Sequence, residues 1–396
     1  MKRVYITTFL TALLLLAVFS GVLTAWDGSH RVDTLKVGFI YKNDESTPYT
    51  YNFMLAQEAL EREYPGRVQV YTRSNVPDEE TMEPLRELVR AGCAVIFTNN
   101  NSSDLIEAAR EYPDVEFCQG AFAAGEGVQT PENYHTFYSA IYEGRYATGV
   151  VAGLKLRDLI DAKVIAPDEA LVGYLGSFAN PDVISGYTAF LLGVRSVAPE
   201  AVMRVRYTGT WNSYSREKAG AAQLIEEGCV IIAHHTDTIG PAVACEEAAA
   251  SKRVFHVGYH ESMTDIAPST SLLSARTNWA VYVIGAVEAL LEGGQIERHV
   301  PGQAQGNGMW AGFDHGWVEL TELNRQIAPE GTQEKLDQVI DALRKGHIDV
   351  FRGDYIGVDP QDPSDTVDLS SGYRENADSP WPSFHWVLKD VITVEE

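Results

Sequence analysis

Aromatic, amide and carboxylate side chains recur directly after short apolar runs of the sequence. Nine of them are candidate ligand-binding residues: Tyr49, Asn99, Gln119, Phe178, Trp211, Asp237, Tyr259, His260 and Trp279. Flat aromatic faces can stack on a flat molecule, and one carboxylate with several amides can read the edge of a heterocycle or the hydroxyls of a sugar. A single aromatic residue at such a position usually packs in the core, but five at equivalent positions favour a binding site.

Catalytic interpretations of the same segments are weaker. Two sets of residues could bind a metal ion: His234, His235 and Asp237, or His256, His260 and Glu261. No His-Glu-x-x-His spacing accompanies them, which disfavours a metal site. After the predicted strands there is neither a Gly-x-Ser-x-Gly turn for a serine nucleophile nor a glycine-rich phosphate loop. The pattern calls for no enzyme and no cofactor, and a hydrolase that uses His235 and Asp237 is a minor alternative.

The elements that must position these residues alternate along the first part of the chain. Predicted strands cover residues 35–41, 68–71, 94–98 and 115–119, and predicted helices cover 51–64, 79–90 and 103–112. Strands that are apolar throughout are buried on both faces, which is typical of a parallel sheet covered by helices. Right-handed crossovers then predict a doubly wound unit, in which ligands bind beyond the carboxyl ends of the strands.

A second unit of the same kind follows. Its predicted strands are 171–176, 203–207, 230–233, 255–258 and 272–275, and its predicted helices are 182–197, 215–227 and 240–250. Long helices predicted at 142–160 and 280–291 are candidates for crossing between the units. The expected fold class is therefore α/β, with two doubly wound parallel-sheet lobes joined by a hinge and a cleft between them.

We expect four parts of the chain. They are a signal peptide or membrane anchor at 1–25, a first lobe at 33–139 plus 277–294, a second lobe at 140–276 plus 295–325, and a C-terminal extension at 326–396 that packs on the lobes.

The N-terminal segment indicates export. Lys2 and Arg3 precede an uncharged apolar stretch at residues 4–26, as in a signal peptide. The stretch is also long enough to span a bilayer, so an uncleaved anchor is the alternative. Either way the rest of the chain is expected in the periplasm or on the outer face of the cytoplasmic membrane. The four cysteines could form two disulfides, but their positions in strand-like and helix-like runs favour buried free thiols.

The composition limits the class of partner. The 396 residues include 55 acidic and 31 basic ones, for a formal net charge of −24, and so negative a chain disfavours nucleic acid. With 45% hydrophobic residues the chain can bury a large core, which argues against intrinsic disorder.

Several motifs occur together at the expected lobe boundary and strand ends. They are Tyr-Glu-Gly-Arg-Tyr at 142–146, Gly-Val-Val-Ala-Gly-Leu at 149–154, Val-Gly-Tyr-Leu-Gly at 172–176, His-Thr-Asp at 235–237, Gly-Tyr at 258–259 and Asn-Trp at 278–279. With these motifs the chain resembles the basic membrane protein family, the substrate-binding proteins of ABC-type nucleoside and purine uptake systems. It is most similar to the branch whose members bind adenine or related purines.

This resemblance implies a type I periplasmic-binding fold, closure of two lobes on one ligand, no catalysis, and an ABC permease as partner. It implies that Tyr49 and Trp211 stack on or line the ligand, and that Asp237 reads polar ring or ribose atoms. Phe178, Tyr259 and Trp279 would line the same cleft. We expect a monomer.

Two departures from the family pattern leave the ligand open. His260 stands where relatives usually carry an acidic residue, and the asparagines at 99–101 replace the usual small and aromatic mix. Glu143 and Arg145 are expected to cap a helix or pair between lobes rather than to touch the ligand.

The expected function is that of an extracytoplasmic solute-binding protein that captures a purine base or nucleoside and delivers it to an ABC permease. The alternative, which an uncleaved anchor would favour, is an extracellular ligand-sensing module coupled to a signalling partner.

Overall fold

The computed structural model of the chain describes residues 34–121, 128–377 and 379–395. The predicted signal or anchor segment at 1–25 lies outside these residues. Among the described helices, none is long and apolar enough to cross a membrane.

The first lobe is a seven-stranded sheet with helices on both faces. Its strands, in spatial order, are β11 (Gln303–Gln305), β12 (Gly308–Ala311), β5 (Tyr134–Ser139), β4 (Glu116–Gly120), β3 (Val95–Thr98), β1 (Leu35–Ile40) and β2 (Val68–Arg73). Its helices are α2 (Pro48–Glu63), α3 (Met82–Arg90), α4 (Asp104–Glu111), α9 (Trp279–Glu292) and α10 (Ile296–His299). All strand pairs are parallel except β11 with β12. One apolar cluster joins α2 and α9 to the sheet, and another joins α3 and α4 to it.

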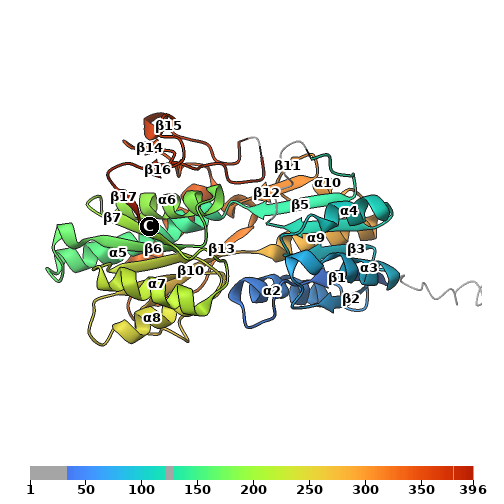
Figure 1. Cartoon of the computed structure of the whole chain (residues 1–396), viewed down its shortest axis with the longest axis horizontal. Helices are drawn as coiled ribbons and strands as arrows, with labels where there is room; N and C mark the ends of the chain where they lie inside the picture. Colours follow the sequence, from blue (N-terminus) through green and yellow to red (C-terminus); the bar gives the residue numbers. More distant parts are fainter. Residues whose placement is uncertain (1–33, 122–127, 378, 396) are drawn as a thin grey trace, which may run out of the picture.

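The second lobe repeats this plan. Its seven strands, in spatial order, are β13 (Val318–Leu320), β10 (Ser271–Thr277), β9 (Phe255–Tyr259), β8 (Ile231–His235), β6 (Leu171–Gly176), β7 (Val202–Tyr207) and β17 (Ile392–Glu395). Its helices are α5 (Ile141–Asp161), α6 (Pro181–Arg195), α7 (Tyr214–Glu226), α8 (Gly240–Ala248) and α11 (Thr332–Arg344). Here β13 alone runs antiparallel to its neighbour. Figure 1 shows the two lobes side by side, with β1 in the right-hand lobe and β6 in the left-hand one.

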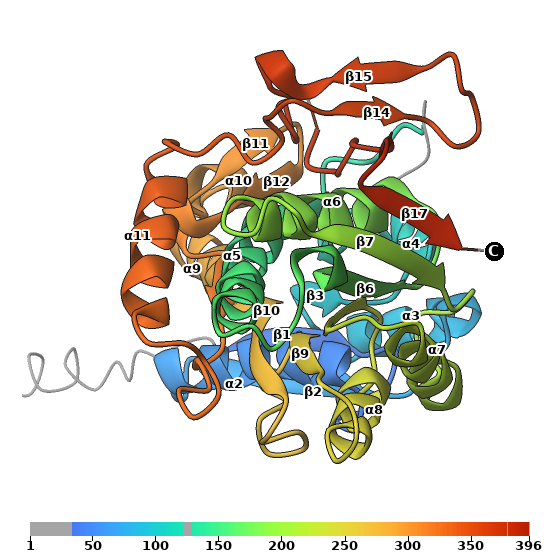
Figure 2. The same ribbon diagram turned by 90° about the vertical axis from the view of Figure 1, so that its left-hand side faces the viewer.

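The C-terminal extension covers one side of the second lobe. After α11 it forms a small antiparallel sheet of β15 (Thr366–Asp368), β14 (Ile356–Val358) and β16 (Val387–Leu388). Figure 2 shows this sheet above α6 and β7, with β17 at the edge of the lobe. Because β17 pairs in parallel with β7, the end of the chain completes the sheet of the second lobe.

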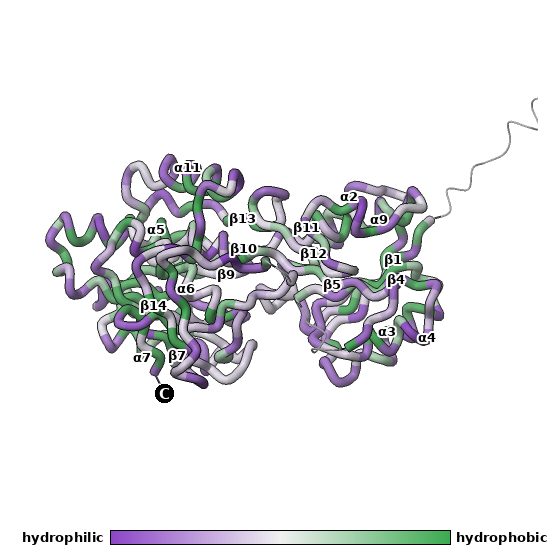
Figure 3. The backbone as a smooth tube through the Cα atoms, turned by 90° about the horizontal axis from the view of Figure 1, so that it is seen from above, coloured by the Kyte–Doolittle hydropathy of each residue, from purple (hydrophilic) through white to green (hydrophobic). Residues whose placement is uncertain are grey.

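Three short segments connect the lobes. They lie between β5 and α5, between β10 and α9, and between β12 and β13. The first two are joined by a hydrogen bond of 2.6 Å between the hydroxyl groups of Ser139 and Thr277. Seen from above, the lobes meet at a narrow waist beside β10, β12 and β13 (Figure 3).

Two helices of the second lobe pack backbone against backbone. A Cβ atom added at Gly149 in α5 would lie 2.1 Å from the carbonyl oxygen of Phe190 in α6. A Cβ at Gly193 would lie 2.1 Å from the carbonyl oxygen of Tyr146. Glycine is therefore required on both sides of this contact, because any side chain would overlap with the facing backbone. The contact fixes the start of α5, and with it one connection between the lobes.

The predicted fold class is confirmed: the chain forms two α/β lobes with mainly parallel sheets. The four cysteines are free and buried, as their positions favoured. The expected assignment of residues 295–325 to the second lobe is wrong in part, since α10, β11 and β12 belong to the first lobe and only β13 joins the second. The long helices also do not cross between lobes; α5 and α9 each begin just after a crossing.

Candidate functional site

A cavity of about 420 Å³ lies between the lobes, at the carboxyl ends of strands from both sheets. This is where ligands bind in open α/β sheets. Seven of the nine predicted residues line it: Tyr49, Asn99, Trp211, Asp237, Tyr259, His260 and Trp279. It is also lined by Lys42, Asn101, Ala121, Tyr138, Ile141, Asn180, Pro181, Asp182, His235, Thr277, Trp381 and Pro382. The cavity is thus lined by residues from both lobes and from the C-terminal extension.

Aromatic rings form much of the wall. Tyr49, in the first turn of α2, lies 5.2 Å from the ring of His260 across the gap between the lobes. Tyr259 packs edge-on against His235, with the ring centroids 4.9 Å apart. Trp211 is 5.9 Å from His235. Aromatic rings from both lobes therefore line the cavity, and flat apolar ring faces suit a planar guest.

Two carboxylates face the cavity from the second lobe. Burial raises the pKa of Asp237 to about 7, and the positive charge of Lys42 offsets only part of this effect. Burial also raises the pKa of Asp182 to about 6, although Tyr138 donates a hydrogen bond to it. Lys42 is itself paired with Asp78 at 2.5 Å. Carboxylates in this setting favour a guest that brings hydrogen-bond donors.

The imidazoles of the cavity are held in the neutral form. Burial, followed by the nearby positive charge of Arg145, holds the pKa of His235 and of His260 well below the usual range. Arg145 is 1% exposed, lies 3.6 Å from the ring centre of Tyr259 and donates to the carbonyl of His234. It therefore supports the cavity wall from behind. Arg145 does not line the cavity, and because its hydrogen bond to His234 lies within the second lobe, it does not form the expected pair between the lobes.

Several buried polar atoms at the cavity have no hydrogen-bond partner within the described residues. They are both ring nitrogens of His260, Nε1 of Trp279 and Nδ1 of His235. The His260 Nε2 atom lies 3.4 Å from Asp237 without hydrogen-bond geometry. Buried polar atoms are normally paired, so these atoms favour a polar guest that completes their bonds. His260 also has a left-handed backbone with φ of 68°, a strain often found at functional sites.

Two predicted residues do not line the cavity. The Gln119 amide donates to the carbonyls of Asn100 and Ser102 and accepts from the Tyr134 hydroxyl, so its hydrogen bonds hold a loop in place. The side chain of Phe178 is 40% exposed and packs beside Trp211, with the ring centroids 6.0 Å apart. These two residues therefore lie outside the cavity that the other seven line.

Other lining residues were not predicted. Asp182 opens α6, directly after the cap residue Asn180 and Pro181, and a carboxylate at a helix N-terminus usually signals only capping. Tyr138 lies near the end of β5, a strand that the sequence pattern did not show. Trp381 comes from the C-terminal extension and lies 5.0 Å from Tyr138. The additional lining residues Lys42, Asn101, Ala121, Asn180, His235 and Thr277 did carry a signal, because each follows closely after a predicted strand.

Across the mouth of the cavity the two lobes touch. The Asn212 amide donates to the Thr47 hydroxyl at 3.4 Å, and neither residue lines the cavity. Near the hinge, the Asn52 amide in α2 donates to the carbonyl of Thr277 at 3.0 Å. The two lobes are therefore in contact at Asn212 and Thr47 as well as near the hinge.

The two residue sets that were considered and disfavoured as metal ligands, around His234 and His256, are not among the groups of closely spaced donors in the described residues. In the described part of the chain, the one group with three suitable donors within 4.8 Å is Asp359, Asp365 and His385. It belongs to the small C-terminal sheet and none of its members lines the cavity.

Comparison with known proteins identifies a matching family and two similar proteins. Residues 36–348 match the Bmp family model, described as ABC transporter substrate-binding protein PnrA-like. The chain is 26% identical over 329 residues to a purine-binding protein of Brucella abortus, covering 82% of this chain and 85% of the relative. It is 27% identical over 332 residues to a putative ABC transporter glucose-binding protein of Haloferax volcanii, covering 82% and 76%.

A solved structure shares the fold. The solute-binding protein of an ABC transporter system from Aeropyrum pernix superposes with a TM-score of 0.64 at 16% identity, covering 83% of this chain and 95% of that one. The family match ends before residues 349–396, so most of the C-terminal extension lies beyond it.

Proposed function

Because the chain belongs to the Bmp family of PnrA-like ABC transporter substrate-binding proteins, we propose that it captures a purine base or nucleoside and delivers it to an ABC permease. The family consists of solute-binding proteins rather than enzymes, and its members are extracytoplasmic. The proposed working form is a monomer, in which one ligand is enclosed between the two lobes.

One observation carries this proposal: aromatic faces and unpaired polar atoms line the same cavity. A purine ring between Tyr49 and Trp211 would bury both its faces, and each stacked pair adds about 1 kcal/mol beyond the burial of area. The ring nitrogens of a purine accept hydrogen bonds, and Trp279 Nε1 and a neutral His260 can donate them. Amino groups and ribose hydroxyls can donate to Asp237 and Asp182.

The relative of Brucella abortus carries purine binding in its name, which supports the purine class. The relative of Haloferax volcanii is named for glucose, and a sugar could also stack on aromatic rings and donate to carboxylates. A hexose is therefore the competing class of ligand that an experiment must separate from purines.

The test is thermal unfolding of the purified protein with each member of two panels. We expect adenine, adenosine, guanosine or inosine to raise the melting temperature, because a ligand that binds only the folded state stabilises it. Glucose, galactose and ribose should leave it unchanged. A shift with a hexose and none with any purine would overturn the ligand assignment.

Asp237→Ala tests the role of the carboxylate. We expect the Kd for the stabilising purine to rise at least about tenfold, since a hydrogen bond to a charged group contributes about 1.5–3 kcal/mol. The matched control is Asp168→Ala, an exposed aspartate outside the cavity, which should leave the Kd unchanged. An unchanged Kd in a folded Asp237→Ala variant would remove Asp237 from the site.

A further inference from the structure

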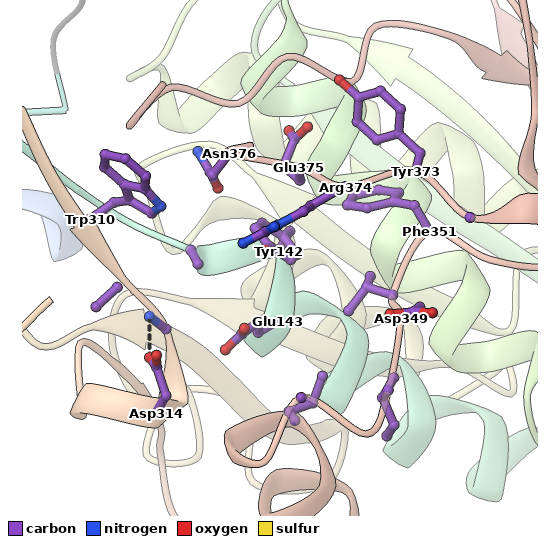
Figure 4. A pocket seen from close by; sticks show the side chains of 18 of the residues that line it. Tyr142, Glu143, Trp310, Asp314, Asp349, Phe351, Tyr373, Arg374, Glu375 and Asn376 are labelled. Carbon is purple, nitrogen blue, oxygen red and sulfur yellow. Dashed lines mark hydrogen bonds between the residues drawn. The ribbon is translucent and has the colours of Figure 1, made fainter. Parts of the chain in front are cut away.

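A second cavity lies beside the hinge and shares no lining residue with the first. Its volume is about 540 Å³, within the range of about 300–1,000 Å³ that is usual for small-molecule sites. Its walls come from the start of α5, the end of β12 with the connection after it, and the C-terminal extension up to Asn376 (Figure 4). A ligand bound in the first cavity would contact none of the residues that line this second cavity.

An amide oxygen and a carboxylate in this cavity lack the partners that buried groups normally have. Asn376 is 5% exposed, and its amide nitrogen donates to the carbonyls of Ser379 and Pro380. Its Oδ1 atom has no donor within the described residues. Glu143 accepts one hydrogen bond, from the backbone of Phe313 at 2.8 Å. No described cation lies within ion-pair distance of Glu143, and burial raises its pKa to about 7.

A cation enters the same space from the extension. In Figure 4 the Arg374 guanidinium extends over Tyr142 toward the cavity, with Trp310 at the far wall and Glu143 below. Among the described residues, none forms a hydrogen bond or ion pair with Arg374. Arg374 is exposed, and in this view it lies between Asn376 and Glu143. The cavity therefore presents a positive group with a carboxyl group on one side and an amide oxygen on the other.

We propose that this cavity binds a free α-amino acid, with its carboxylate on Arg374 and its ammonium group on Glu143. An anion without an ammonium group would leave Glu143 facing negative charge. A cation without a carboxylate would leave Arg374 without a partner. The rings of Tyr142, Trp310 and Phe351 offer contacts for an apolar or aromatic side chain.

Binding here would act on the hinge. Glu143 belongs to the first turn of α5, directly after one connection between the lobes, and its partner Phe313 lies in another. A Cβ at Gly312 would lie 2.1 Å from the Glu143 carboxylate, so this connection passes tightly over it. An amino acid on Glu143 therefore touches two of the three segments that must move when the lobes open.

The test is calorimetric titration of the purified protein with each of the twenty common L-amino acids. We expect at least one to bind. Its amide derivative, which lacks the carboxylate, and its deamino derivative, which lacks the ammonium group, should each bind at least about tenfold more weakly.

Two variants then test which residue binds the carboxylate of the amino acid and which binds its ammonium group. In Arg374→Gln the amino acid should lose at least about tenfold in affinity and no longer be preferred over its amide. In Glu143→Gln, which keeps an acceptor for the Phe313 amide, the preference over the deamino derivative should disappear. The matched control Lys389→Gln removes one exposed cation of the extension outside the cavity and should change nothing.

The outcomes are independent of the first cavity. Purine binding should persist in Arg374→Gln, and amino acid binding should persist in Asp237→Ala. If none of the twenty amino acids binds, or if binding is unaffected by both Arg374→Gln and Glu143→Gln, the proposal is wrong whatever the purine experiments show.

Discussion

Gln119 lies near the end of the buried strand β4 and Asp237 follows the buried strand β8, yet their polar groups have different surroundings. The Gln119 amide has three hydrogen-bond partners in its own lobe. The Asp237 carboxylate accepts none from the described residues, and its nearest polar contact is His260 at 3.4 Å. The sequence places both at a strand end but cannot tell them apart, because the partners of Gln119 come from the segment after β3 and from β5, a strand that the sequence pattern did not show. At the residue scale, the unpaired group is the better candidate for binding.

The raised pKa of Asp237 makes purine binding depend on pH. With a pKa of about 7 in the empty protein, the carboxylate is mostly ionised at pH 8 and mostly protonated at pH 6. Ligand donors bind the ionised form, so affinity should increase as the pH rises through 7. We expect the Kd to be roughly tenfold higher at pH 6 than at pH 8, since the ionised fraction falls about tenfold per unit below the pKa.

Calorimetric titration at pH 6, 7 and 8 measures this effect. Asp237→Asn is the control, because it cannot ionise and should show a Kd that varies little over this range. An equal Kd at pH 6 and pH 8 in the unaltered chain would contradict the proposed hydrogen bond to ionised Asp237.

At the scale of elements, the close contact between α5 and α6 leaves no room for a side chain at the positions where the two backbones meet. We expect Gly149→Ala to lower the free energy of unfolding by about 3 kcal/mol, because the added methyl group would overlap with the Phe190 carbonyl and force the helices apart. The control is Gly294→Ala, where the new Cβ would lie 3.5 Å from its nearest neighbour, an ordinary contact. Urea denaturation of both variants should show a loss for Gly149→Ala only.

The elements that the sequence revealed are those with continuous Val, Ile and Leu runs, such as β1, β3 and β8. β5 was missed because its residues, Tyr-His-Thr-Phe-Tyr-Ser, are buried but not aliphatic. β11 and β12 were assigned to the wrong lobe, since short strands that return to a distant sheet carry no local signal. Because β5 was missed, neither Tyr138 nor its hydrogen bond to Asp182 could be predicted. The sequence therefore predicted the two lobes but placed the third connection between them before residue 295, whereas it lies between β12 and β13.

At the scale of the whole molecule, the hydrogen bond between Asn212 and Thr47 offers a test of whether the two lobes close on the ligand. It joins the lobes outside the cavity, so it can stabilise only the closed form. We expect Asn212→Ala to raise the Kd for the purine by about two- to tenfold, the effect of one lost hydrogen bond of about 0.5–1.5 kcal/mol. Thr210→Ala, in the same loop but without a partner in the first lobe, should not change it.

Small-angle X-ray scattering adds a measurement of shape. The radius of gyration should fall when purine is added, because the ligand selects the closed form. A radius that stays constant on binding, together with an unaltered Kd in Asn212→Ala, would show that the lobes do not move.

Strand β17 has a consequence for how the protein is made. It is built from residues 392–395 and lies beside β7, whose residues are about midway along the chain. The sheet of the first lobe is likewise incomplete until β12 has been synthesised and pairs with β5. During synthesis and secretion neither half can therefore finish folding early, and a polypeptide cut short by only a handful of residues would leave the ribosome with an uncovered sheet edge, the kind of surface on which chains aggregate.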